Sequence, residues 1–523
     1  MHIKSFFSFS LFILIGSSAF CQQADATKYA QFINTAALKK HLTILASDSL
    51  EGRETGTIGQ RKAADYIQRQ FKKMGLQKPQ NINGYEQFFP LLKDSMVASN
   101  LSINGATLLW GTDYYSPLMF NETNRFQSDK LVFAGYGIDD RNYSDYTNLD
   151  VKGKVVLLIN GKLKKELSKN DMGETTNWNN SKKIKTAFEK GAVGVLMIEP
   201  FTEKISAATM SRNKKTNRYF PDASVEKNAI NYAIISHQTG KSIIGDDFDN
   251  IIQTATKGYS LNEIVKAWSL PLQYNYTVNH DTIYASNVLG VVEGSDKKNE
   301  YVFLTAHYDH LGMKDGKVYN GADDDGSGTV TVLQMAEAFA KAKKDGKGPR
   351  RTMVFMTVSG EEKGLWGSEY YSDHPIYPLE KTTVDLNTDM IGRVDTERKT
   401  ADTLNYVYVV GHDKISSELP LINEAVNNKH TKLVLDYKFD DPNDPNRIYY
   451  RSDHYNFARK GIPVLFFYDG MLKSDYHKTT DDIEFINWPL FEKRAQMIFY
   501  TAWEIANRND QLKRDKPLPS GSE

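Results

Sequence analysis

The spacing of apolar residues divides the chain into three regions. Residues 37–76 carry apolar side chains at helical intervals, and Gly75 stands where a left-handed helix end belongs. Between about residues 130 and 257 the apolar runs are short and separated by turns, which predicts a small α/β module. From about residue 277, short apolar runs alternate with helical patterns. This alternation predicts an α/β sheet that is covered by helices on both faces.

Each region yields specific expected elements. The candidate strands of the third region are residues 287–292, 301–306, 352–358, 383–386, 406–410 and 463–468. Its candidate helices are residues 328–343, 365–372, 415–427, 452–459 and 490–507. In the middle module we expect strands over residues 131–137, 153–159 and 193–198, and a helix over residues 182–190.

The first 21 residues are typical of a secretory signal peptide. Lys4 precedes a mostly apolar stretch over residues 6–15, and small residues follow it at positions 16–19. About ten mostly apolar residues are too few to span a bilayer. We therefore expect export to the periplasm or the extracellular space, with cleavage after Cys21. The alternative is a lipid anchor at Cys21, which the bulky Phe20 disfavours.

The composition of the chain excludes several classes of protein and of metal site. The chain has 523 residues, of which 40% are apolar and 25% charged, so a folded protein of several domains is expected. Its 65 basic and 65 acidic residues balance, which argues against a nucleic-acid-binding protein. Because there is a single Cys, a disulfide scaffold and a Cys-ligated zinc are excluded. No later stretch of the sequence has eighteen uninterrupted apolar residues, so no transmembrane segment is predicted. Any metal must be held by His and carboxylate side chains.

Five segments of the third region place ionisable residues after expected strands or in turns. They are residues 305–310, 320–328, 359–364, 387–393 and 476–481. In an open α/β sheet, ligands bind at the carboxyl ends of the strands, so these segments are best interpreted together. The second segment contains three adjacent Asp residues, whose mutual repulsion is unfavourable unless cations or hydrogen-bond donors compensate it. Taken alone, each segment is equally compatible with an ordinary turn.

In this order the five segments resemble the motifs of the co-catalytic dizinc aminopeptidases, a group that includes glutamate carboxypeptidase and the non-enzymatic transferrin receptor. The matching stretches are His-Tyr-Asp-His (307–310), Gly-Ala-Asp-Asp-Asp-Gly-Ser-Gly (321–328), Gly-Glu-Glu-Lys-Gly-Leu-Trp-Gly-Ser (360–368), Asn-Thr-Asp-Met-Ile-Gly (387–392) and Asp-Tyr-His-Lys-Thr-Thr-Asp (475–481), with Arg-Ser-Asp-His (451–454) and Leu-Ala-Ser-Asp-Ser-Leu-Glu-Gly-Arg (45–53) as further matches. The resemblance covers nearly the whole exported chain. It implies a mixed central sheet with helices on both faces, as in zinc exopeptidases.

The resemblance also implies a role for each matching residue. His307 and Asp389 would bind one zinc ion, Glu362 and His477 a second, and Asp324 would bridge the two; other divalent ions are compatible with this ligand set. Asp309 would orient His307, Glu361 would be the general base, and Tyr476 would donate a hydrogen bond to the tetrahedral oxyanion. The implied activity is hydrolysis of N-terminal residues from peptide substrates by a metal-activated water.

Several alternatives stay open at this stage. The same dizinc site also serves carboxypeptidases and dipeptidases, and the scaffold also occurs in non-catalytic binding proteins. The middle module resembles the protease-associated domain through Phe133-Ala134-Gly135-Tyr136-Gly137, with a passive spacer as the other interpretation. The expected organisation is a signal peptide (1–21), a catalytic domain in two parts (22–129 and 258–510), the inserted protease-associated domain (130–257) and a flexible tail (511–523).

Overall fold

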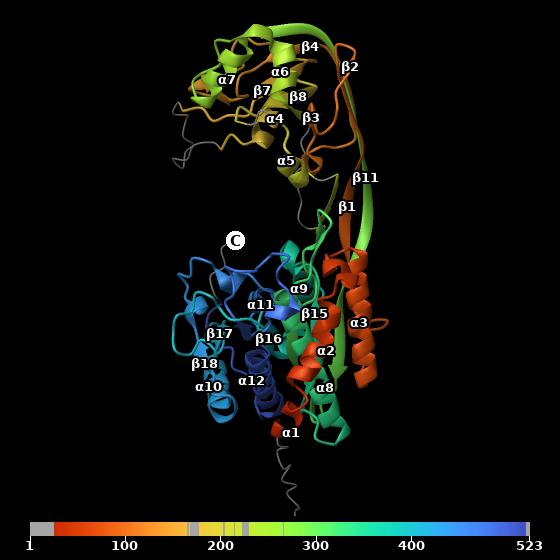
Figure 1. Ribbon diagram of the computed structural model, residues 1–523, viewed down its shortest axis with the longest axis vertical. Helices are drawn as coiled ribbons and strands as arrows, with labels where there is room; N and C mark the ends of the chain where they lie inside the picture. Colours follow the sequence, from red (N-terminus) through yellow and green to blue (C-terminus); the bar gives the residue numbers. More distant parts are fainter. Residues whose placement is uncertain are drawn as a thin grey trace, which may run out of the picture. The chain divides into compact units, whose positions relative to one another are not determined.

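The structure is a computed structural model that describes residues 26–164, 167, 177–201, 204–213, 215–221, 230–264 and 266–518 (Figure 1). The expected signal peptide and Cys21 lie outside these residues. The chain divides into two compact units, of which the first combines Met1–Gln87 with Ser286–Glu523 and the second is Phe88–Ala285. None of the helices in the described part of the chain has the length and apolar character needed to cross a membrane.

A mixed sheet forms the centre of the first unit. Its strands, in spatial order, are β18 (Val434–Asp436), β17 (Tyr406–Val410), β19 (Val464–Tyr468), β16 (Thr382–Thr388), β12 (Lys297–His307), β15 (Arg351–Val358) and the end of β11 (Lys266–Val292). The middle strands β19, β16, β12 and β15 are parallel neighbours, whereas β11 and β17 pair antiparallel with β15 and β19. The predicted α/β fold with a mixed sheet is therefore confirmed.

Helices cover both faces of this sheet. They are α1 (Ala26–Ala30), α2 (Thr35–Leu45), α3 (Ile58–Met74), α8 (Gly328–Lys344), α9 (Trp366–Asp373), α10 (Leu419–His430), α11 (His454–Ala458) and α12 (Trp488–Asn507) (Figure 1). On one face Phe355 of β15 packs against Phe339 of α8, which also contacts Phe499 of α12. On the other face Phe303 of β12 packs against Tyr371 of α9 and Phe457 of α11. Because successive side chains of a strand point to opposite faces, strands that are buried on both sides need apolar residues at nearly every position.

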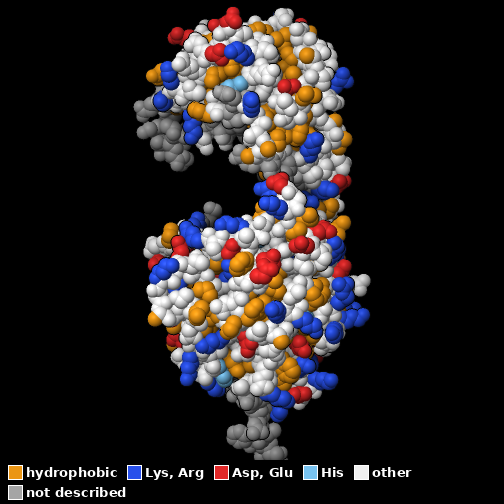
Figure 2. Space-filling view, in the orientation of Figure 1, with side chains coloured by type: hydrophobic (Ala, Val, Ile, Leu, Met, Phe, Trp, Pro, Cys, Tyr) orange, Lys and Arg blue, Asp and Glu red, His pale blue; other side chains and the backbone are white. Residues whose placement is uncertain are grey.

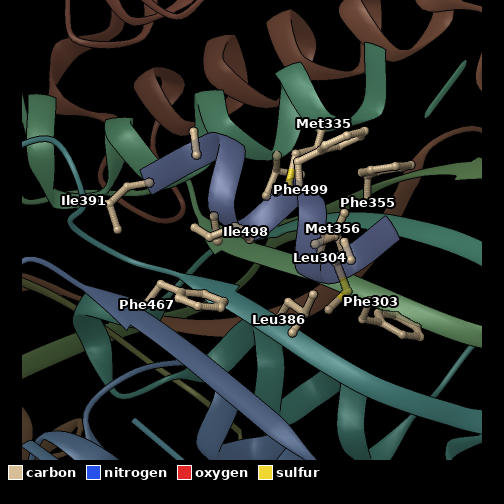
Figure 3. Packing of buried hydrophobic residues seen from close by; sticks show 14 of the residues in the cluster. Phe303, Leu304, Met335, Phe355, Met356, Leu386, Ile391, Phe467, Ile498 and Phe499 are labelled. Carbon is tan, nitrogen blue, oxygen red and sulfur yellow. The ribbon is translucent and has the colours of Figure 1, made fainter. Parts of the chain in front are cut away.

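Figure 3 shows the first of these two layers from close by. Met335 of α8 and Phe499 of α12 lie beside Phe355 of β15, with Leu304 of β12 close by. These side chains are completely buried. The uninterrupted apolar runs that predicted the central strands are thus explained by burial on both faces.

In the second unit the strands follow the order β4 (Asn124–Phe133), β7 (Val155–Ile159), β8 (Gly194–Ile198), β10 (Tyr232–Ile235) and β3 (Tyr114–Tyr115). Its helices are α4 (Asn180–Glu189), α5 (Ala207–Arg212), α6 (His237–Ile244) and α7 (Phe248–Thr256). The remaining strands of this unit are the long β1 (Glu86–Ile103), with its partners β2 (Ala106–Thr107) and β9 (Thr216–Tyr219), and the hairpin of β5 (Asp139–Asp140) and β6 (Tyr143–Ser144).

The second unit is wider than the module expected at residues 130–257. Residues 124–133 pair with residues 266–276 of β11, and Tyr114–Tyr115 pair with β10. Residues on both sides of the expected boundaries therefore complete its sheet. Likeness of this unit to a protease-associated domain stays a prediction.

Candidate metal centre

Several of the predicted residues lie at the ends of three parallel strands, at one edge of the sheet. His307 is the last residue of β12, Glu361 and Glu362 follow the end of β15, and Asp389 follows the end of β16. Since β12 lies between β15 and β16 and runs parallel to both, the carboxyl ends of the three strands meet. The segments before α8 and after β19 contribute Asp324 and His477. All eight site residues expected from the sequence come from the first unit.

The first cluster consists of His307, Asp324 and Asp389. His307 Nε2 lies 3.3 Å from Asp324 Oδ1 and 3.5 Å from Asp389 Oδ1. His307 Nδ1 contacts the carbonyl oxygen of Asp309 at 3.1 Å, and because a carbonyl only accepts, this nitrogen carries the proton. The lone pair of Nε2 therefore faces the carboxylates, which is the state of a metal ligand.

The second cluster shares Asp324 with the first. His477 Nε2 lies 3.2 Å from Asp324 Oδ2 and 3.0 Å from Glu362 Oε2. His310, which has no predicted role, lies on the same side, with Nδ1 2.7 Å from Glu362 Oε1. Asp324 thus turns one oxygen to each cluster. His477 adopts a φ of 57°, in the sparsely populated left-handed region where strained functional residues are often found.

The donor atoms of both clusters fit divalent cations. His307 Nε2, Asp324 Oδ2 and Glu362 Oε1 are buried and make no hydrogen bond among the described residues. Unpartnered buried polar atoms are unfavourable, so a set of them that converges requires a shared partner. Donors at about 2.0–2.2 Å from one zinc ion lie roughly 3.3–3.5 Å apart in a tetrahedral arrangement, which matches the 3.3 and 3.5 Å of the first cluster, whereas the 3.2 and 3.0 Å of the second cluster are shorter. Imidazole and carboxylate are also the ligands that zinc takes in the absence of cysteine.

The acids on either side of Asp324 have different surroundings. Asp323 Oδ1 accepts a hydrogen bond from the backbone N–H of Gly392 at 2.7 Å. Asp325 accepts from the N–H groups of Gly328 and Met390. Burial raises the pKa of both flanking acids well above its usual range. Although burial alone would raise it too, the pKa of Asp324 lies well below its usual range because His307 and His477 face its carboxylate. Of the three acids, Asp324 is the one that belongs to the groups of side chains that could hold a metal ion.

Asp309 and Glu361 lie beside the first cluster. The Asp309 carboxylate accepts a hydrogen bond from the Thr55 hydroxyl at 2.7 Å and a longer one from the Glu361 N–H at 3.3 Å. Its nearest oxygen is 3.7 Å from His307 Nδ1, farther than its own carbonyl oxygen. Glu361 Oε2 lies 3.8 Å from His307 Nε2. Burial, with the carboxylates of Asp389 and Glu362 nearby, raises the pKa of Glu361 well above its ordinary value.

A small cavity of about 30 Å³ opens beside Asp389 of the first cluster and the shared Asp324. It is lined by Asp324, Glu361, Asp389, Met390, Ile448, Arg451, Phe466, Tyr468, Leu472 and Tyr476. The Tyr476 hydroxyl accepts a hydrogen bond from Arg451 Nη2 at 3.0 Å. Burial raises the pKa of this phenol, which keeps its proton in place.

Sequence reasoning gave no role to several residues at this site. Arg53 is completely buried and donates hydrogen bonds to the carbonyl oxygens of Leu45, Tyr308, Asn320 and Gly321. Asp481 accepts from the N–H of Asp324 at 3.0 Å. Arg53 and Asp481 stand in stretches that carried the resemblance, which was the available signal. Thr55 lies two residues beyond such a stretch, so no sequence signal pointed to it.

A third group of metal-type ligands has another explanation. His412, Asp413 and Asp440 lie together. Lys414 Nζ is 3.2 Å from Asp440 and 3.6 Å from Asp413, and Lys516 Nζ is 3.6 Å from Asp413. Because these ammonium groups already compensate the two acids, we assign no cation to the group.

Comparison with known proteins decides the family. The sequence profile of peptidase family M28 matches residues 287–502, which contain all eight predicted site residues. This domain belongs to peptidase family M28. The predicted family of zinc-dependent peptidases, a class of hydrolases, is therefore confirmed for the M28 domain.

Named relatives and solved structures are similar to the chain. It is 27% identical over 235 residues to a probable leucine aminopeptidase of Trichophyton verrucosum, and 26% identical over 239 residues to aminopeptidase YwaD of Bacillus subtilis. Each match covers 44% of this chain, but only 60% and 47% of the relative. An aminopeptidase from Aneurinibacillus sp. strain AM-1 covers 95% of this chain and 98% of its own, with a TM-score of 0.51 and 16% identity. A zinc aminopeptidase from Bacillus subtilis covers 93% and 99%, with a TM-score of 0.50 and 19% identity. At these identities the solved structures show the fold alone.

Proposed function

We propose that this protein is an exported dizinc aminopeptidase that removes N-terminal residues from peptides. The observation that carries the proposal is the pair of clusters that share Asp324, next to the buried carboxyl group of Glu361. The names of the relatives support the aminopeptidase activity. Export rests on the first 21 residues of the sequence, and lipid anchoring at Cys21 is the alternative.

The predicted residues would hold the two ions in the following way. His307 and Asp389 would bind one, His477 and Glu362 the other, and Asp324 both. Two divalent cations held there would polarise the scissile carbonyl group and lower the pKa of the attacking water.

The remaining chemistry falls to side chains of this chain. Glu361, beside the first cluster, would accept a proton from the attacking water and pass it to the leaving amine. Tyr476 already accepts a hydrogen bond from Arg451, so its own O–H can be donated to the developing oxyanion. Thr55 would hold the Asp309 carboxylate in place through its 2.7 Å hydrogen bond. Since the Asp309 carbonyl oxygen fixes the His307 tautomer, this contact stabilises the site indirectly.

Three charged residues of the cavity bear on which peptide end is bound. Glu361 and Asp389 line it, and their carboxylates favour the ammonium group of a free N-terminus. Arg451 also lines it and would favour a free C-terminal carboxylate instead, as in a carboxypeptidase. The names of the relatives favour the aminopeptidase.

One experiment separates these activities. The purified mature protein would be assayed on matched peptides with free, N-acetylated or C-amidated ends, with and without a chelator. We expect cleavage of the free and C-amidated peptides, no cleavage of the N-acetylated peptide, and loss of activity on chelation. Cleavage of N-acetylated but not C-amidated peptides would establish a carboxypeptidase. Cleavage that resists the chelator would refute the metal mechanism, and a protein that binds ions and peptides without turnover would be a binding protein.

A further inference from the structure

His310 lies in the second cluster with no role assigned to it. It is completely buried, and its ring packs edge-on against that of His477, with 6.0 Å between the ring centroids. Its Nδ1 lies 2.7 Å from Glu362 Oε1 and 3.9 Å from Asp324 Oδ2. It therefore faces the same two carboxylates as His477.

His310, Glu362 and Asp324 form one of the groups of side chains whose donor atoms could hold a metal ion. Although the two atoms are only 2.7 Å apart, both His310 Nδ1 and Glu362 Oε1 count among the buried polar atoms without a hydrogen-bond partner in the described residues. Buried polar atoms that converge in this way are unfavourable unless a third group satisfies them. A cation beside them does so, since it accepts the lone pairs of both atoms.

We infer that His310 is an additional ligand of the second metal ion, bound through Nδ1. The inference rests on the proposed dizinc function and goes beyond the five ligands implied by the sequence motifs. The second ion would then be held by His310, His477, Glu362 and Asp324. The first ion has one imidazole, from His307, with Asp324 and Asp389.

The surrounding backbone holds the His310 ring in this position. Arg53 donates hydrogen bonds to the carbonyl oxygens of Tyr308, Asn320 and Gly321, which ties together the two segments on either side of the ring. Gly321 has a φ of 53°, and a Cβ atom there would lie 2.5 Å from His310 Cγ. Only glycine leaves room for the imidazole at this point. The ring is thus fixed before any ion binds, as a ligand should be.

The two subsites would differ in metal affinity as a consequence. Imidazole favours zinc, copper and nickel, whereas carboxylates alone suit manganese and magnesium. The second subsite, with two imidazoles, would retain its ion when the first subsite has already released its own. Removal of His310 would abolish this difference.

The test compares the metal content of His310→Ala with that of the wild-type protein and of His454→Ala. His454 is a matched control because it is also completely buried and both its ring nitrogens lack hydrogen-bond partners. Each protein is dialysed against graded chelator, and bound zinc is counted by elemental analysis. We expect wild type and His454→Ala to release their two ions at different chelator concentrations. His310→Ala should lose the tightly held ion at a chelator activity about tenfold lower or more.

A second measurement needs no variant. X-ray absorption at the zinc edge of the fully loaded wild-type protein counts imidazoles, and we expect three shared by two ions rather than two. A count of two, or unchanged ion retention in a folded His310→Ala protein, would overturn the inference while leaving the dizinc proposal intact. Equal loss in His454→Ala would overturn it as well, because general loosening would then explain the effect. A wild-type protein that binds no divalent ion would overturn both proposals.

Discussion

Substitution of Glu361 should impair catalysis without affecting metal binding. Its carboxylate lies 3.8 Å from His307 Nε2, beside the first cluster rather than between the donor atoms of either. We expect Glu361→Ala to reduce kcat by about a hundredfold to ten-thousandfold, the range typical for loss of a general base. The zinc content should stay near two ions per chain. Steady-state kinetics and elemental analysis on the same sample check this, and retained turnover would refute the role.

A single buried acid should give the second unit a measurable pH dependence. Asp145 accepts hydrogen bonds from the N–H groups of Tyr136 and Ile138 and from the hydroxyl of Tyr143. Burial, opposed in part by these bonds, raises its pKa from 3.8 to about 6. The folded state therefore binds more protons than the unfolded state between these values, and the free energy of unfolding falls as the pH rises through them.

The expected size of this effect follows from the same shift. Lowering the pH from 7 to 5 should stabilise the second unit by about 1 kcal/mol through Asp145. Amide hydrogen exchange of β7, corrected for intrinsic rates, measures it. Asp145→Asn should lack this gain, whereas Asp129→Asn, at an exposed position, should keep it. An identical pH dependence in all three proteins would contradict the assignment.

Among the elements, the 3-10 turn that precedes α3 (Asp48–Arg53) is expected to matter most for the site. Its last residue, Arg53, is 1% exposed and donates hydrogen bonds to four backbone carbonyl groups. Arg53→Met would keep the volume but leave these carbonyls without donors. We expect a loss of about 3 kcal/mol in the free energy of unfolding of the first unit. Arg69→Met, on the exposed side of α3, should change it by less than about 0.5 kcal/mol.

That comparison is made by denaturant unfolding of both variants, followed by hydrogen exchange. The exchange of residues 308–321 should accelerate in Arg53→Met, because Arg53 joins Tyr308 to Asn320 and Gly321. Equal stability of the two variants would show that the four hydrogen bonds are replaced by water at little cost.

Sequence patterns predicted the central strands, which are buried on both faces, and missed most of the long strand β11, which is not. The helix expected at 328–343 is α8 (Gly328–Lys344), and the strand expected at 463–468 is β19 (Val464–Tyr468). The long β11 (Lys266–Val292) was expected only at 287–292, where all its residues are buried. Its first part alternates buried and exposed residues, with a Pro at position 271, so no continuous apolar run marks it. Its partner β4 is also more than a hundred residues away, and no local signal specifies such pairing.

The same limit applies within the site. The ordered motifs placed His307, Asp324, Glu362, Asp389 and His477 at the ends of strands, and the structure brings them together. His310 stands inside one of those motifs, yet the direction of its ring depends on the space above Gly321 and on the anchoring of two loops by Arg53. Such tertiary constraints are invisible in a linear pattern.

At the scale of the whole molecule, charge is balanced overall and concentrated locally. On the face shown in Figure 2, acidic and basic side chains are interspersed. Within the first unit, by contrast, Asp324, Glu361, Glu362 and Asp389 converge on a few ångströms of buried space. Although the formal net charge of the chain is zero, these buried carboxylates form a local concentration of negative charge that requires cations.

This distribution predicts that metal removal destabilises only one of the two units. Among the residues that the structure describes, every candidate ligand belongs to residues 286–523 and none to Phe88–Ala285. Ions that bind only the folded state stabilise it by about 4 kcal/mol at a free concentration a thousandfold above Kd. Chelation should therefore lower the melting temperature of the first unit and leave that of the second unchanged. Calorimetry with and without chelator, with hydrogen exchange to assign each transition, tests this. Equal shifts in both transitions would mean that the units unfold together, and an unchanged first transition would mean that its buried acids are compensated without metal.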